Sequence, residues 1–142
     1  MPQIDQMIAE HDRHSHIVDR LWALTFAEQA LTPARWRRLL EIEVREFSAM
    51  LNVHFASEEQ GGYMRLVVER SSESATLVAF LLEQHQAIRM QFDLLLNRLQ
   101  AGQAVATSLE QLREVLWILR AHEQGENDLV HEVLHRDISV LG

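Results

Sequence analysis

The sequence predicts an all-α fold, an antiparallel up-and-down bundle of four helices. The chain has 142 residues with only five Gly and two Pro, and its Ala-, Leu-, Glu-, Gln- and Arg-rich composition favours helices. Apolar residues recur at spacings of three and four in four long segments, and no segment alternates with a period of two. Short connections between the segments favour antiparallel neighbours. We expect one domain, residues 1–142, around one core.

The first two segments are separated by Thr32 and Pro33, which are typical of an N-cap and a first helical residue. The first segment covers about residues 4–30, and the second runs to about residue 70. Gly61 and Gly62 predict a kink or a frayed turn within the second. The expected inner stripe of the first segment is Ile4, Ile8, His11, Ser15, Val18, Trp22 and Phe26, and that of the second is Trp36, Leu40, Phe47, Leu51, His54 and Glu58.

The third and fourth segments follow a Ser-rich connection at residues 71–74. The third covers about residues 74–100 and is expected to stop at Gly102. Thr107 and Ser108 begin two overlapping capping boxes, which predict the start of the fourth helix, and a short tail is expected from Arg136. The expected stripes are Val78, Leu81, His85, Phe92, Leu96 and Leu99 in the third segment, and Leu112, Val115, Leu119, His122, Glu126, Leu129 and Val133 in the fourth.

Composition excludes several classes of function. A net charge of −8 with scattered Arg residues argues against binding to nucleic acid or to an anionic membrane. The absence of cysteine excludes disulfides, thiolate metal sites, iron–sulfur clusters and thiol catalysis. The first five residues are neither basic nor followed by an apolar run, so we expect no signal peptide, and no apolar run approaches the roughly 20 residues of a membrane span. The expected location is therefore the cytoplasm.

Two histidine–carboxylate pairs carry the chemistry. His54 precedes Glu58 by four residues, and His122 precedes Glu126 by four residues. Positions i and i+4 lie on one face of a helix, so each pair can direct an imidazole and a carboxylate to one point. Together the pairs offer two nitrogen and two oxygen ligands, and carboxylates that can bridge favour two metal ions.

Helix geometry predicts that these pairs meet. At about 1.5 Å rise per residue, equal residue counts on both sides of a connection bring two residues to one level. The counts around each connection agree within about one helical turn for His11, His54, His85 and His122. Each of the four lies within an apolar stripe. A lone His on an apolar face is usually a satisfied core residue, but four His and two Glu in one buried layer favour cations, because buried carboxylates need a partner.

The chain resembles the hemerythrin-like, or HHE cation-binding, family. The resemblance is carried by residues 10–11, 54–59, 85 and 122–127, in that order, and it covers nearly the whole chain. It implies a non-haem centre of two iron ions held by His ligands and bridged by acidic residues. On that basis His11 and His54 would bind one iron, His85 and His122 would bind the other, and Glu58 and Glu126 would bridge them.

One departure from the family lies on the third segment. Oxygen-carrying hemerythrins place two His four residues apart there, whereas His85 has Leu81 one turn before it and Arg89 one turn after it. Neither can bind a metal, because Leu has no donor atom and Arg stays protonated. We expect Arg89 to form an ion pair with a carboxylate. A further ligand could come from His14, from water, or from Glu59 and Tyr63, and the last two could reach inward only if the glycines break the helix.

Two functions from different classes fit this pattern. One is a module that binds or senses O2, or a related small diatomic molecule or peroxide, and a sensor of this kind would need a separate protein partner for its output. The other is an enzyme for peroxide breakdown, iron oxidation or nitric oxide reduction. The missing His favours the enzyme, because it leaves a position for exchangeable water. A purely structural bundle is disfavoured, since four His and two Glu would destabilise a metal-free core.

Overall fold

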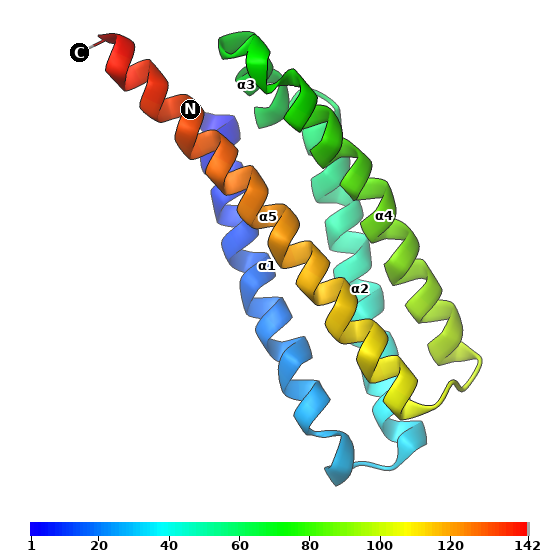
Figure 1. Ribbon diagram of the computed structural model, residues 1–142. Helices are drawn as coiled ribbons and strands as arrows, with labels where there is room; N and C mark the ends of the chain where they lie inside the picture. Colours follow the sequence, from blue (N-terminus) through cyan, green and yellow to red (C-terminus); the bar gives the residue numbers. More distant parts are fainter. Residues whose placement is uncertain (142) are drawn as a thin grey trace.

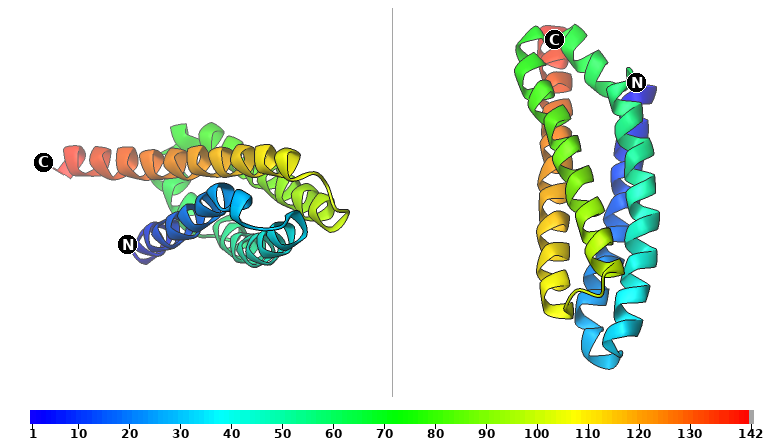
Figure 2. Two further views of the ribbon diagram at one scale, coloured as in Figure 1. Left: turned by 90° about the horizontal axis from the view of Figure 1, so that it is seen from below. Right: turned by 90° about the vertical axis from the view of Figure 1, so that its right-hand side faces the viewer.

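The expected bundle of four long helices is confirmed by a computed structural model that describes residues 1–141, with side chains except those of Glu28 and residues 135–141. The long helices are α1 (Pro2–Phe26), α2 (Pro33–Glu59), α4 (Ala75–Gln100) and α5 (Val105–Leu141). They alternate in direction and lie side by side (Figures 1 and 2). The short elements are η1 (Glu28–Ala30), α3 (Tyr63–Arg70) and η2 (Ser72–Ser74), and no strand occurs in the described part of the chain.

Local signals account for the start of α2 and the end of α4. Thr32 accepts a hydrogen bond from the Arg35 amide at 3.3 Å and Pro33 opens α2, as expected. Gly102 has a φ of 76° and follows α4, which confirms the predicted stop.

The prediction for α5 was wrong at both ends. The helix begins at Val105 and runs to Leu141. Ser108 is therefore already inside the first turn, where its amide donates to the Ala104 carbonyl at 3.1 Å. Its hydroxyl accepts from the Gln103 side chain at 3.1 Å and caps no helix start. Residues 136–141 contain no Gly or Pro, so nothing in this stretch stops the helix where a tail was expected.

The chain breaks between α2 and α3, at the paired glycines. Gly61 has a φ of 105°, which side chains other than that of Gly rarely adopt. A Cβ atom on Gly62 would lie 2.9 Å from the Ser57 carbonyl oxygen. The two glycines thus allow the backbone to turn sharply and bring Tyr63, the first residue of α3, back against the bundle.

The inner face of α1 differs in part from the predicted stripe. Its buried residues are Ile4, Met7, His11, His14, Val18, Leu21 and Thr25. Ile8 is 53% exposed and Phe26 is 80% exposed, and Ser15 is exposed as well. Spacings of three and four can run in either order from Ile4, and apolar residues occupy both alternatives. The structure uses the order that brings His14 inside.

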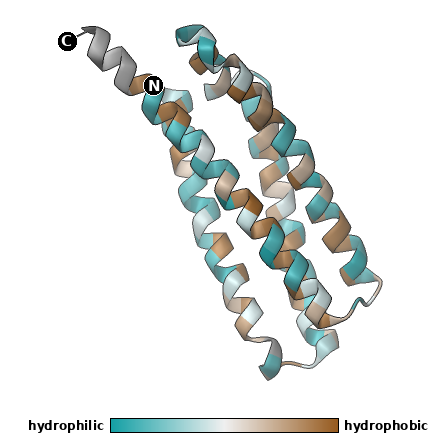
Figure 3. Ribbon diagram, in the orientation of Figure 1, coloured by the Kyte–Doolittle hydropathy of each residue, from teal (hydrophilic) through white to brown (hydrophobic). Residues whose placement is uncertain are grey.

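The apolar core consists of two clusters, one toward each end of the bundle. The larger includes Leu21, Trp36 and Leu116, and the smaller includes Met7, Val67 and Val130. Apolar residues, in brown, alternate with polar ones, in teal, along the helices (Figure 3). The four histidines and two glutamates of the predicted layer belong to neither cluster. Among the described helices, none combines the length and apolarity needed to cross a membrane.

Trp36 should contribute strongly to stability. It is fully buried in the larger cluster, and its indole nitrogen donates to the Leu24 carbonyl at 2.9 Å. We expect Trp36→Ala to lower the free energy of unfolding of the metal-free protein by about 3–5 kcal/mol. Trp117 is 71% exposed and provides a matched control, and Trp117→Ala should change stability by less than about 0.5 kcal/mol. Urea denaturation measures both, and equal effects of the two substitutions would contradict this account of the core.

Candidate metal centre

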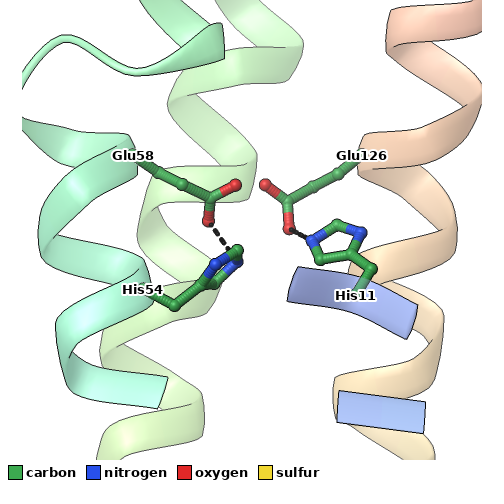
Figure 4. A group of neighbouring side chains, drawn as sticks. All are labelled: His11, His54, Glu58 and Glu126. Atoms are coloured by element: carbon green, nitrogen blue, oxygen red, sulfur yellow. Dashed lines mark ion pairs between the residues drawn. The ribbon is translucent and has the colours of Figure 1, made fainter. Parts of the chain in front are cut away.

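Six buried residues from the four long helices meet in one layer of the bundle. His11 comes from α1, His54 and Glu58 from α2, His85 from α4, and His122 and Glu126 from α5. None is more than 6% exposed. The carboxylates of Glu58 and Glu126 approach each other from opposite sides, each with a histidine beside it (Figure 4). The structure therefore places at one level the residues that the residue counts in the sequence predicted to lie there.

The inward atoms of this layer have no hydrogen-bond partner. They are the Nε2 atoms of the four histidines, both carboxylate oxygens of Glu58 and Oε1 of Glu126. A buried polar atom without a partner costs about 1–3 kcal/mol, and a charged one costs more. Seven such atoms from six residues, in one place, need cations or protons between them.

The spacing of these atoms suits a metal ion. The Nε2 atoms of His54 and His85 lie 3.1 and 3.3 Å from Oε1 of Glu58. Those of His122 and His11 lie 2.9 and 3.4 Å from Oε1 of Glu126. Two ligands at right angles, each about 2.1 Å from one ion, are about 3.0 Å apart. The distances between the donor atoms thus match those between neighbouring ligands of one metal ion.

The donor atoms form two groups that share both carboxylates. One contains His11 and His54 with Glu58 and Glu126, and the other contains His85 and His122 with the same two glutamates. Within each group the atoms lie within 4.8 Å of one another. This is the arrangement that two ions bridged by two carboxylates require. Imidazole nitrogen and carboxylate oxygen are donors that suit iron among other transition metals.

A ring of outer hydrogen bonds fixes the four imidazoles. Each Nδ1 faces an oxygen acceptor on the next helix around the bundle, so each Nδ1 carries the proton and each Nε2 points inward with a lone pair. The pairs are Glu10 of α1 with His54, Glu59 of α2 with His85 (2.9 Å), Gln84 of α4 with His122 (2.8 Å) and Asn127 of α5 with His11 (2.9 Å). Sequence reasoning did not find Glu10, Gln84 or Asn127 as members of this ring.

His14 lies inside the bundle beside the layer. It is 1% exposed, and its Nδ1 is 2.7 Å from a carboxylate oxygen of Glu123. The same oxygen lies 3.4 Å from Nε2 of His11. His14, His54 and Glu123 form a third group of closely spaced donors, but His54 also belongs to the first group. A cation there would compete for His54, so the pair of His14 and Glu123 is best described as an outer partner of the layer.

The other two candidate ligands are Glu59 of α2 and Tyr63 of α3, and both have clear positions. Glu59 forms an ion pair with Arg89 at 3.1 Å, which confirms the expected role of Arg89. Arg89 also lies over the ring of Phe55, 5.3 Å from its centroid. Tyr63 reaches inward because the glycines break the helix, and its hydroxyl donates to Oε2 of Glu126. Leu81 is buried at 2% exposure, without any donor atom.

Burial and mutual repulsion shape the protonation of the two carboxylates. Burial raises the pKa of Glu58 to about 12, and the adjacent carboxylate of Glu126 acts in the same direction. Burial opposes ionisation of Glu126 as well, but the close imidazoles of His11 and His122 hold its pKa well below the usual range. In the absence of a metal ion, Glu58 therefore keeps its proton while Glu126 is ionised.

The same surroundings shift the pKa values of nearby His and Tyr side chains. Burial lowers the pKa of His85 to about 4 and also lowers the pKa of His54. Burial opposes protonation of His11, yet the carboxylates of Glu126 and Glu123 raise its pKa. Burial and the adjacent carboxylate of Glu126 raise the pKa of Tyr63, so its phenol remains a donor. Neutral His85 and His54 are ready to bind a metal without losing a proton.

A family model described as the hemerythrin HHE cation-binding domain matches residues 3–134. The match includes all six residues of the layer and the outer ring around them. No curated protein and no solved structure matched the chain.

The protonation of Glu58 predicts an unusual pH dependence of stability. An ordinary carboxyl pKa is about 4.5, so between pH 4.5 and 12 the metal-free native state binds this proton more tightly than the unfolded state does. Stability should therefore fall as pH rises, by about 1 kcal/mol per pH unit. The lowered pKa of His85 acts in the opposite direction only between about pH 4 and 6.5. The fall is thus clearest above pH 7.

Urea denaturation of the metal-free protein between pH 7 and 9 measures this slope. Glu58→Gln removes the titrating group and should make the slope much shallower. Glu46 is exposed on the same helix, so Glu46→Gln is a matched control that should keep the wild-type slope. Equal slopes in wild type and Glu58→Gln would show that Glu58 does not hold the proton.

Proposed function

The chain belongs to the hemerythrin family of HHE cation-binding domains, and we propose that it holds two iron ions with which it binds or senses O2 or a related small diatomic molecule or peroxide. The family establishes cation binding, and the donor set supports iron. The single observation that carries the proposal is the convergence of seven buried polar atoms without hydrogen-bond partners. His11 and His54 would hold one ion, His85 and His122 the other, and Glu58 and Glu126 would bridge them.

Two bound ferrous ions would supply electrons and exchangeable positions to a small ligand. The protein's part is to hold the ligand atoms and to limit water. The ring of outer acceptors orients the four imidazoles, and the apolar clusters on both sides separate the layer from bulk solvent. When metal replaces the proton on Glu58, that proton leaves the layer, so cation affinity should rise with pH.

Two cavities reach the layer and support a small ligand. One, of about 570 Å³, lies between α1 and α5, with His11 and Asn127 in its lining. The other, of about 500 Å³, is lined by residues of α2, α3 and α4 and reaches Glu58. Each touches only one of the six residues of the layer. A diatomic molecule or peroxide could approach along either route, whereas a bulky substrate would have few atoms of the centre to contact.

A di-iron enzyme for peroxide breakdown, iron oxidation or nitric oxide reduction is the second candidate. Leu81 favours it, because this buried residue stands where a further His would bind iron in an oxygen carrier. Arg89 cannot replace that ligand, since it is paired with Glu59. Fewer protein ligands leave more positions for water and substrate. For either function we propose that the protein is cytoplasmic. A sensor would also need a separate protein partner for its output.

Metal analysis tests the composition of the centre. Protein produced with ample iron should contain two iron ions per chain. We expect His54→Ala and Glu126→Ala each to lose at least one of them, because each residue belongs to the layer. His16→Ala on α1 and Glu110→Ala on α5 are controls with the same residue types at exposed positions, and both should retain both ions. Retention of both ions by either layer variant, with its helix content intact by circular dichroism, would refute the assignment.

Optical spectroscopy separates binding from catalysis. We expect the reduced protein to form an absorption band with O2 that disappears under vacuum and returns with fresh O2. Such reversibility follows if the buried layer keeps water from the ligand. Rapid gas evolution after addition of hydrogen peroxide, without a reversible band, would instead establish the enzyme.

A further inference from the structure

The two carboxylates of the layer are not equivalent. Glu58 has both oxygens free of hydrogen bonds. Glu126 has only Oε1 free, because Oε2 accepts a hydrogen bond from the hydroxyl of Tyr63. Both glutamates follow a His by four residues, and both are at least 95% buried. The two motifs are alike in spacing and in burial, so the difference arises from Tyr63.

The position of Tyr63 is well defined by its surroundings. The side chain is 1% exposed and belongs to the smaller apolar cluster, together with Met7 and Leu129. It is the first residue of α3, directly after the break at Gly61 and Gly62. Packing of the ring and the turn of the backbone therefore both direct the hydroxyl toward Glu126. The carboxylate can only accept in this contact, so the phenol donates.

We propose that Tyr63 is a positioning residue that restricts Glu126 to one metal-binding oxygen, Oε1, whereas Glu58 binds through both of its oxygens. This inference rests on the proposed function, since it requires cations in the layer. Oε1 of Glu126 lies 2.9 Å from Nε2 of His122 and 3.4 Å from Nε2 of His11, so this single oxygen faces both groups of donors. Glu126 would thus offer one oxygen to the cations, and Glu58 would offer two.

Infrared difference spectroscopy between the Zn²⁺-bound and metal-free protein tests the inference. Zn²⁺ is a suitable probe because it has no redox chemistry. A carboxylate that binds through one oxygen shows a wider separation of its two stretching bands than one that binds through both. Wild type should show one wide and one narrow pair. Tyr63→Phe keeps the packed ring, should keep two Zn²⁺ ions per chain, and should lose the wide pair as Oε2 becomes free.

The assignment of the bands comes from Glu58→Gln, which should lose the narrow pair and retain the wide one. Persistence of the wide pair in Tyr63→Phe would overturn the role of Tyr63 and leave the proposed function intact. Wild-type protein that binds neither Zn²⁺ nor iron would refute the proposed function itself, and the inference with it.

Tyr63 is the only tyrosine of the chain, which gives a second and independent readout. Resonance Raman spectra of the ferric protein should lack enhanced tyrosine ring vibrations, because the phenol donates to Glu126 and does not bind iron. Enhanced ring vibrations would mean that Tyr63 is a direct ligand and would overturn the positioning role. Any such signal belongs to this one residue, so no assignment by mutagenesis is needed.

Discussion

The structure depends on one unfavourable feature, the burial of two carboxylates that the protein cannot satisfy by itself. Glu58 and Glu126 are 5% and 0% exposed, and three of their four oxygens have no hydrogen-bond partner. The apolar clusters on both sides hold the helices together around the buried layer. Protonation of Glu58 relieves only part of the cost. A pair of cations would satisfy all of these atoms at once, and for this reason metal binding and folding are expected to be linked.

The outer ring explains how four separate helices present four rings in the same tautomer. Each acceptor is the direct neighbour in sequence of a layer residue on its own helix: Glu10, Glu59, Gln84 and Asn127 flank His11, Glu58, His85 and Glu126. A residue one position away points about 100° around the helix, toward the adjacent helix. The acceptor precedes its neighbour on α1 and α4 and follows it on α2 and α5, in step with the alternating helix directions. Each helix therefore orients an imidazole of the next, and a shift of any one helix would break two of these contacts.

Much of this centre could be predicted because each residue of a regular helix adds the same rise and the same rotation. Rise per residue alone brought His11, His54, His85 and His122 to one level, and their positions in apolar stripes turned them inward. The inner face of α1 was less determined, since either order of three and four residues from Ile4 meets apolar residues. The choice depends on packing against neighbouring helices, which a single sequence does not encode locally. The acceptors of the ring share this limit, because their partners lie on other helices. Their one local signal is that each is a polar residue beside a layer residue.

The break at Gly61 and Gly62 decides what the two histidine–glutamate motifs can do. On a continuous helix Tyr63 would lie about 140° around from Glu58, directed away from the layer. The break instead returns its hydroxyl to Glu126 on a different helix, and it leaves Glu58 with both oxygens free. A chain with two similar motifs thereby acquires an asymmetric centre, in which one carboxylate is held and the other can adjust. Because Glu58 also carries the proton that a metal displaces, the carboxylate that must change most on metal binding is the one that no side chain restrains.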